Sequence, residues 1–255
     1  MKDNVSIIIL AGGKGTRMES DAPKALTLLD GKPFLSHILE TIKSSFGEAI
    51  KPVIVVGYKK EEVIKTIGED YTYAVQEEQL GTGHAVKITE EYLQDKTGSV
   101  VILYADHPMI SGETIKALVE KQQETKSPIV MATTIVPHFE DWYHTFIGWG
   151  RFKRNSMDDI TAIIEYKDAD DQEKAICEVN PGYSVFDKAW LFEHLQKLSN
   201  ENAQKEYYLT GLVQFAFDEG YVIPSVTIPP EEAIGANSLK ELEILEQIYN
   251  KKNKS

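Results

Sequence analysis

The feature that most restricts the fold of this chain is an alternation of short apolar segments with amphipathic segments along its first half. The runs Val5–Leu10, Pro52–Val56 and Val100–Tyr104 are short and apolar, which is typical of buried strands. Apolar residues recur at helical spacing in the segments Phe34–Ile42, Lys60–Ile67 and Gly112–Gln123. This alternation predicts a mostly parallel sheet with helices on both faces. Ligands of such sheets bind beyond the carboxyl ends of the strands.

From about Pro128 the pattern changes, because strand-like segments become frequent and helical ones scarce. The strand-like segments are Ile129–Val136, Gly148–Arg154, Ile160–Tyr166 and Ala175–Val179. We expect them to pair antiparallel in a smaller lobe attached to the first sheet. Further helices are expected over Lys188–Leu198, Leu209–Phe217 and Leu239–Tyr249, and a strand over Val222–Ile228. Ser238 and Glu241 predict a capping box at the start of the last helix.

The composition excludes several classes of function. The 255 residues include 27 Lys and Arg against 40 Asp and Glu, so the net charge is −13 and no uniformly basic surface is available for duplex DNA or an anionic membrane. The single cysteine, Cys177, excludes an intrachain disulfide and a cysteine-rich zinc site. No cleavage site follows the run Val5–Leu10, and no segment is long enough to span a bilayer. We therefore expect a cytoplasmic protein with no nucleic-acid and no membrane partner.

A glycine-rich loop, LAGGKGTRM at residues 10–18, follows the first strand directly. Its glycines allow backbone N–H groups to face a phosphate, and the start of the next helix adds positive charge. The loop is neither a P-loop nor a GxGxxG dinucleotide loop. Glycines alone would also suit a plain turn. The cations Arg17 and Lys24, which follow the glycines in an acidic protein, favour a polyphosphate ligand.

The loop followed by Pro23-Lys24 resembles the signature of nucleoside triphosphate:sugar-1-phosphate nucleotidyltransferases. Six further blocks occur in the order of that family and cover nearly the whole chain: QEEQLGTGHAV (76–86), YADHPMI (104–110), GWGRFKR (148–154), IIEYKDADDQEKAICEVNPGY (163–183), EYYLTG (206–211) and GAN (235–237). This set is most similar to the N-terminal, uridylyltransferase half of the bifunctional N-acetylglucosamine-1-phosphate uridylyltransferases.

The resemblance implies an α/β chain with a Rossmann-like, three-layer α/β/α nucleotidyltransferase fold and a mixed, mostly parallel sheet. We expect one domain, 1–255, in which 1–127 and 222–255 form the nucleotide- and metal-binding core and 128–221 form an inserted sugar-phosphate-binding lobe. The implied reaction is Mg²⁺-dependent transfer from UTP to N-acetylglucosamine-1-phosphate, which gives UDP-N-acetylglucosamine and pyrophosphate. The attacking phosphate oxygen is already an anion, so catalysis requires positioning and charge neutralisation rather than an activated serine or cysteine.

The resemblance also implies the residues of the site. Arg17 and Lys24 would be catalytic, and Asp106 and Asn237 would bind Mg²⁺. The nucleotide would be bound by Leu10, Ala11, Gly12, Gly13, Gly15, Thr16, Gln76, Gly81 and Thr82. The sugar would be bound by Gly150, Glu165, Asn180, Tyr208 and Thr210.

Several of these residues also have ordinary structural interpretations. Asp106 could be a turn residue before Pro108, and Asn237 could cap the last helix. Asn180 belongs to an Asn-Pro-Gly turn sequence, and Glu165 could simply face solvent. The histidines show no metal-binding spacing, and His107 is of interest only because it is adjacent to Asp106.

The chain departs from the usual family motifs at six positions: Ala105, His107, Met109, Pro181, Gly211 and Ser238. Pro181 and the neighbouring Trp149 flank the expected sugar site, so the choice of sugar remains open. Transfer of a uridylyl or thymidylyl group to another hexose-1-phosphate is an alternative, and so is a non-catalytic nucleotide-sugar sensor. The bifunctional enzymes that the chain resembles continue into a left-handed β-helix of hexapeptide repeats, which transfers an acetyl group to glucosamine-1-phosphate and forms a trimer. The chain has no hexapeptide repeat. We therefore expect a monomer or small homo-oligomer, without acetyl transfer and without that trimer.

Overall fold

A computed structural model describes residues 4–13 and 22–253 of the chain. The strands are β1 (Val5–Leu10), β2 (Leu28–Leu29), β3 (Lys32–Pro33), β4 (Val53–Val56), β5 (Thr72–Val75), β6 (Ser99–Tyr104), β7 (Ile129–Ile135), β8 (Arg151–Arg154), β9 (Ile160–Ile164), β10 (Glu178–Val179), β11 (Ser184–Asp187) and β12 (Ser225–Thr227). The α-helices are α1 (Phe34–Phe46), α2 (Lys60–Ile67), α3 (Thr82–Lys87), α4 (Gly112–Thr125), α5 (Asp171–Lys174), α6 (Lys188–Leu195), α7 (Gly211–Asp218), α8 (Pro230–Ala233) and α9 (Leu239–Asn253). The 3₁₀ helices are η2 (Lys24–Leu26), η3 (Glu90–Leu93) and η4 (Asp141–Phe146).

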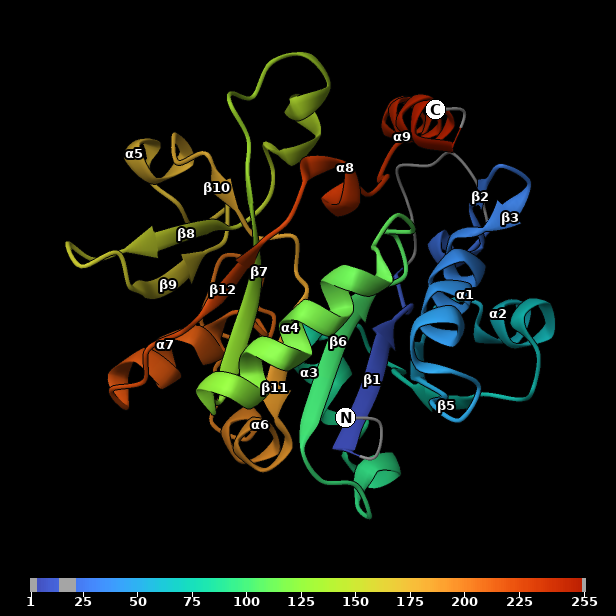
Figure 1. Ribbon diagram of the computed structural model, residues 1–255, viewed down its shortest axis with the longest axis horizontal. Coiled ribbons are helices and arrows are strands. Elements are labelled where there is room, and N and C mark those ends of the chain that lie inside the picture. The colour runs from blue at the N-terminus through green and yellow to red at the C-terminus, as the bar shows by residue number, and fades with distance from the viewer. Residues whose placement is uncertain (1–3, 14–21, 254–255) are drawn as a thin grey trace.

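One large mixed sheet organises the described part of the chain. Its strand order is β5–β4–β1–β6–β11–β7–β10–β8–β9, with β12 beside β7. The strands β5, β4, β1 and β6 pair in parallel, whereas β11 runs antiparallel to both β6 and β7. Figure 1 shows α4 crossing one face of this sheet, and α4 contacts β6, β7, β11 and β12. The α/β fold expected from the sequence is confirmed.

Alternating side chains of the central strands bury against helices on the two faces. Ile7 and Ile9 of β1 belong to the core cluster that includes the buried residues of α1 and α4, while Ile8 belongs to the cluster of α3, α6 and α7. Successive strand residues point to opposite faces, so a strand that is apolar throughout must be covered on both sides. On α1 the buried residues Phe34, Leu35, Ile38, Leu39, Ile42 and Phe46 follow helical spacing.

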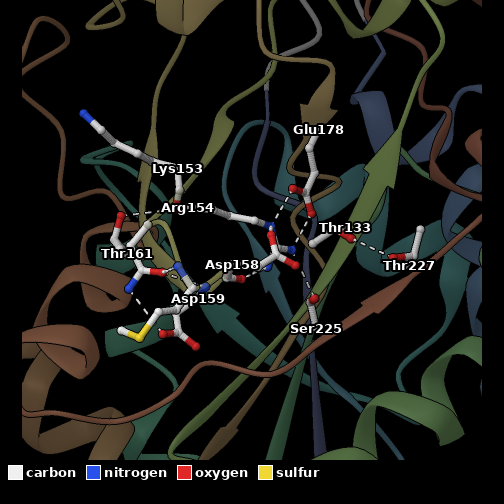
Figure 2. Close-up of polar contacts among 11 residues, drawn as sticks. Thr133, Lys153, Arg154, Asp158, Asp159, Thr161, Glu178, Ser225 and Thr227 are labelled. Atoms are coloured by element: carbon white, nitrogen blue, oxygen red, sulfur yellow. Dashed lines mark hydrogen bonds and ion pairs between the residues drawn. The ribbon is translucent and has the colours of Figure 1, made fainter.

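The lobe beyond β7 is an antiparallel extension of the sheet. The hairpin of β8 and β9 joins the sheet through β10, which pairs with both β7 and β8. Figure 2 shows how Arg154 attaches this hairpin: its guanidinium donates to the Glu178 carboxylate of β10 at 2.7 and 2.8 Å and to Ser225 Oγ of β12 at 3.4 Å. In the same view, the Thr133 and Thr227 hydroxyls lie 3.2 Å apart and link β7 to β12.

Two expectations about the second half of the chain were wrong. The segment 175–179 was expected to be a strand, but only Glu178–Val179 forms one; the preceding residues 171–174 form helix α5, capped by the Asp170 carboxylate. Strand β11 was not expected at all, although it is central in the sheet. With four residues, it is too short for its sequence to distinguish it from the helix that follows.

The capping of α9 differs slightly from the predicted box. Ser238 Oγ accepts the Glu241 N–H at 3.3 Å, as expected. The Glu241 carboxylate, however, accepts the N–H of Asn237 at 2.6 Å rather than that of Ser238. This bond ties the backbone of Asn237 to the first turn of α9. None of the helices in the described residues is both long enough and apolar enough to cross a membrane.

Candidate active site

Asp106 lies just beyond the carboxyl end of the parallel strands. β1 and β6 pair in register up to Leu10 and Tyr104, and the Ala105 N–H then donates to the Leu10 carbonyl at 3.0 Å. The loop after β1 and the loop after β6 therefore leave the sheet side by side. Because ligands of parallel sheets bind at this edge, the position suits a catalytic carboxylate.

Lys24 joins the two residues that the sequence suggested as metal ligands. Its ammonium donates to the Asp106 carboxylate and, at 2.5 Å, to the side-chain oxygen of Asn237. Lys24 begins η2, Asp106 follows β6, and Asn237 precedes α9. Three distant parts of the chain thus place two oxygen atoms around one cation.

The surroundings of Asp106 keep its carboxyl group ionised. Burial by itself would raise the pKa of Asp106, but the charge of Lys24, the neighbouring His107 and the hydrogen bond from Lys24 lower it to about 2. At neutral pH the group is therefore a full anion that is balanced by a single ammonium. Such a carboxylate is ready to bind a cation.

The described residues of the predicted nucleotide site line one cavity of about 280 Å³. They are Leu10, Ala11, Gly12, Gly13, Gln76, Gly81 and Thr82; the lining also includes Lys24, which was predicted to be catalytic, and Tyr104, Asp106 and Glu206. Gly15, Thr16 and Arg17 lie outside the described residues. The glycine loop and the segment 76–82 therefore face the same space, although more than sixty positions separate them in the sequence.

The Gln76 side chain is buried and held in one orientation. Its amide nitrogen donates to the Gly81 carbonyl at 3.1 Å and lies 3.1 Å from His84 Nδ1. Gly81 itself has a φ of +102°, and a Cβ there would lie 2.8 Å from the Tyr207 carbonyl oxygen. Only glycine fits this position, which brings the segment 76–82 against the segment 206–210.

Most of the predicted sugar residues line a second cavity, of about 480 Å³. Gly150, Glu165, Asn180 and Thr210 face it, whereas Tyr208 is not among the described residues that line either cavity. The two cavities share Thr82, Tyr104 and Asp106. Asp106 therefore lies where the two cavities meet.

Glu165 and Asn180 are half-buried polar residues at this second cavity. Thr210 Oγ1 donates to Glu165 Oε1 at 2.8 Å. Burial raises the pKa of Glu165; the bond from Thr210 partly opposes that rise, and nearby carboxylates add to it. Asn180 Oδ1 accepts the Gly182 N–H at 2.9 Å. Asn180 therefore has the ordinary turn role and also faces the cavity.

His107 is buried in an aromatic cluster beside Asp106. Its ring is parallel to that of Trp149, with 5.2 Å between ring centroids, and lies edge-on to Tyr183 at 5.6 Å. Burial lowers the pKa of His107, the Asp106 charge opposes this, and the Lys24 charge reinforces it. The imidazole is therefore neutral near pH 7 and acts as a packing group. A Cβ on Gly235 would lie only 2.2 Å from His107 Cδ2.

Comparison with protein families matches residues 7–208 to the model described as the MobA-like NTP transferase domain. The chain belongs to this NTP transferase family. It is accordingly a nucleotidyltransferase.

Curated relatives of this NTP transferase include the bifunctional protein GlmU of Psychrobacter sp. (41% identical over 99% of the chain and 53% of the relative) and that of Brevibacillus brevis (38% identical over 97% of the chain and 52% of the relative). The chain thus spans about half the length of these relatives. A UDP-glucose pyrophosphorylase complexed with UDP-glucose has the same fold, with a TM-score of 0.74, 17% identity and coverage of 98% and 99%. A CMP:2-keto-3-deoxy-manno-octonic acid synthetase complexed with CTP also has this fold, with a TM-score of 0.67, 15% identity and coverage of 98% of this chain and 99% of that chain.

The donor set of this NTP transferase fits a hard divalent cation. Asp106 offers a carboxylate oxygen and Asn237 an amide oxygen, and both contact the same Lys24 ammonium. Magnesium in proteins is bound by one or two such oxygens, while water and substrate phosphates complete its shell. Among the described residues, no three His, Cys, Asp or Glu side chains gather as a metal site.

Sequence reasoning did not identify Tyr104, which lines both cavities. Burial raises its pKa, as do the charges of Glu165 and Asp106, while a hydrogen bond with Thr82 lowers it. Its position as the last residue of β6, two residues before Asp106, is the signal that could have revealed it. Apolar strand composition hid this signal, because tyrosine is common in buried strands.

Proposed function

We propose that this NTP transferase transfers a uridylyl group from UTP to N-acetylglucosamine-1-phosphate and forms UDP-N-acetylglucosamine. A phosphate oxygen of the sugar phosphate attacks the α-phosphorus of UTP. The bond between that phosphorus and the bridging oxygen breaks, and pyrophosphate leaves with the electron pair. Because no proton must be removed from the nucleophile, the protein has to align two anions and neutralise their charge.

The observation that carries this proposal is the meeting of the two cavities at Asp106. A nucleotide in the first cavity would place its phosphates near Lys24 and Asp106. A sugar phosphate in the second cavity would bring its phosphate to the same point. The attacking oxygen and the α-phosphorus could then meet there, as phosphoryl transfer requires.

The residues divide into groups by the chemistry that each can supply. Lys24, with Arg17, would bind phosphate oxygens and stabilise the leaving pyrophosphate. Mg²⁺ held by Asp106 and Asn237 would neutralise charge on the phosphate oxygens. The carbonyl oxygen of Gln76, whose amide nitrogen is already engaged, can accept the imide N–H of uracil.

The sugar phosphate would bind in the lobe 128–221. Glu165, Asn180 and Thr210 provide acceptors and donors for the hydroxyl groups of a neutral ring, and Gly150 provides a backbone group. Buried polar groups of this kind favour a ligand that pairs with all of them, since an unpaired one costs free energy. A polar, hydroxyl-rich ligand therefore suits this cavity better than an apolar one.

The proposal is tested by Mg²⁺-dependent pyrophosphate release from UTP or dTTP combined with several sugar-1-phosphates. We expect the highest kcat/KM with UTP and N-acetylglucosamine-1-phosphate, and loss of release in Asp106→Asn. Activity centred on another hexose-1-phosphate or on dTTP would keep the mechanism and refute the substrate assignment. Binding of UTP or a UDP-sugar without release in any combination would identify a non-catalytic nucleotide-sugar sensor instead.

A further inference from the structure

Arg151 is a buried cation that the reaction described above does not use. It is 0% exposed and is among the largest fully buried side chains of the described residues. Its hydrogen-bond acceptors are backbone carbonyls rather than carboxylates: those of Ile147, Trp149 and Lys174. Its guanidinium also lies over the Phe139 ring, at 4.5 Å from the centroid, and over the Tyr166 ring at 5.3 Å.

Burial of a charge without a partner carboxylate is costly, so the contacts of Arg151 must outweigh a large desolvation term. Burial accordingly lowers the pKa of the Arg151 guanidinium, although an arginine stays protonated in proteins. Carbonyl groups and aromatic faces are the compensating partners here. Two of the three carbonyls belong to the loop 147–150, which lines the second cavity. The Arg151 guanidinium therefore fixes the position of two carbonyl groups in that loop.

The direction of the loop's N–H groups follows from these bonds. The described peptide bonds are trans, so the N–H of each residue points opposite to the carbonyl that precedes it. The Trp149 carbonyl faces Arg151; the Gly150 N–H therefore points away from Arg151. The Asn180 N–H donates to the Gly150 carbonyl at 2.9 Å. Gly150 and Asn180 both line the second cavity.

The Gly150 N–H has no hydrogen-bond acceptor within residues 4–13 and 22–253, although Gly150 is buried. By the same geometry, the bond of 2.9 Å from Arg151 to the Ile147 carbonyl turns the Gly148 N–H away from the guanidinium. A buried donor without an acceptor is costly unless a ligand satisfies it.

We propose that Arg151 is a positioning residue that aims the Gly150 and Gly148 N–H groups at the sugar phosphate. This inference rests on the proposed function. It adds that Arg151 orients the peptide groups around Gly150. The planar fork of Arg151 reaches three carbonyls at once, which a lysine cannot do. A positive charge alone at position 151 is therefore not enough to hold the loop 147–150 in this orientation.

The test compares Arg151→Lys and Arg151→Met with Arg154→Met as the matched control. Arg154 is on the same strand and holds the lobe through Glu178, but it does not contact the loop 147–150. Affinity for UDP and for UDP-N-acetylglucosamine is measured by calorimetry, and KM is measured for each substrate. For both Arg151 variants we expect the KM for the sugar phosphate to rise at least about tenfold, while affinity for UDP and the KM for UTP stay within about twofold. Arg154→Met should change neither KM by more than about twofold.

Each outcome decides the question. An unchanged KM for the sugar phosphate in Arg151→Lys, or an equal rise in Arg154→Met, would overturn the positioning role. If Arg151→Lys loses UDP affinity through misfolding, Arg151→Met decides, because its unbranched apolar side chain can still pack on the Phe139 and Tyr166 rings. If the wild-type protein binds UDP and UDP-N-acetylglucosamine equally and turns over no sugar phosphate, the proposed function fails. If the wild type binds UDP and UDP-N-acetylglucosamine with different affinities and the Arg151 variants do not, the proposed function and the role of Arg151 both stand.

Discussion

The ion pair between Lys24 and Asp106 makes a measurable prediction for the variant Asp106→Asn. The two side chains are 13% and 21% exposed, so solvent screens their attraction only weakly. Burial opposes ionisation of Asp106, yet Lys24 lowers its pKa from the usual 3.8 to about 2. Each pKa unit corresponds to about 1.4 kcal/mol. The lowered pKa of Asp106 therefore corresponds to about 2 kcal/mol of folding free energy at neutral pH.

The sign of the pH dependence follows from the direction of the pKa change. The pKa is lower in the folded state, so the stabilisation is present above the usual pKa of 3.8 and is lost as the pH falls toward about 2. Asp106→Asn should therefore unfold more easily than the wild type by about 2 kcal/mol at neutral pH. The difference should shrink as the solution is acidified.

The assay is urea unfolding followed by tryptophan fluorescence, with a chelator present so that no divalent cation contributes. Wild type and Asp106→Asn are compared at neutral pH and near about pH 3. Glu40→Gln is the control, because it breaks an exposed ion pair with Lys32 that solvent screens, so its effect on stability should be much smaller than that of Asp106→Asn. A difference between wild type and Asp106→Asn that is the same at both pH values would refute the reasoning, and so would a more stable variant at neutral pH.

Three further substitutions test other parts of the site. Burial raises the pKa of Glu165, so its charged form destabilises the folded state at a pH above the usual carboxyl pKa. Glu165→Gln should therefore raise the melting temperature at neutral pH. The same variant should raise the KM for the sugar phosphate about tenfold, because a polar partner of the sugar is altered. Gly235→Ala would place a Cβ 2.2 Å from His107 and 2.8 Å from the Asp106 carbonyl, and kcat/KM measurements should show a loss of at least about tenfold while UDP binding persists. Lys24→Met removes the ammonium between two oxygen ligands; turnover should fall about a hundredfold, and Mn²⁺ should bind the nucleotide-free protein more tightly in a spin-resonance titration. Unchanged Mn²⁺ affinity would mean that Lys24 does not compete for the site.

The elements that could be predicted were those with a strong local pattern. β1 (Val5–Leu10) and α2 (Lys60–Ile67) have the predicted bounds, because their apolar residues follow a strand or a helix period without interruption. Strand β11 has no such pattern of its own: its four residues are buried between β6 and β7 and directly precede α6. Its state is decided by its neighbours in the sheet, which local spacing does not record.

Most of the described candidate site residues face one of two adjoining cavities, but the sequence could name them only through ordered motifs. Tyr208 is an instance where motif position did not lead to the cavity wall. Arg151 is the reverse case, since its motif position carried no role until its three carbonyl partners were known. Which side chain reaches a cavity depends on rotamers and loop paths, and these follow from packing.

The sequence by itself determined the α/β class, the positions of the strongly periodic strands and helices, and the chemical types available at their ends. These properties are local, because period, glycine content and charge act on neighbouring residues. Only the tertiary structure decided that Lys24, Asp106 and Asn237 share one point, that two cavities join there, and that Arg151 turns the Gly150 N–H toward one of them. Each of these depends on contacts between residues far apart in the chain, and such contacts form only when the sheet brings its strand ends together.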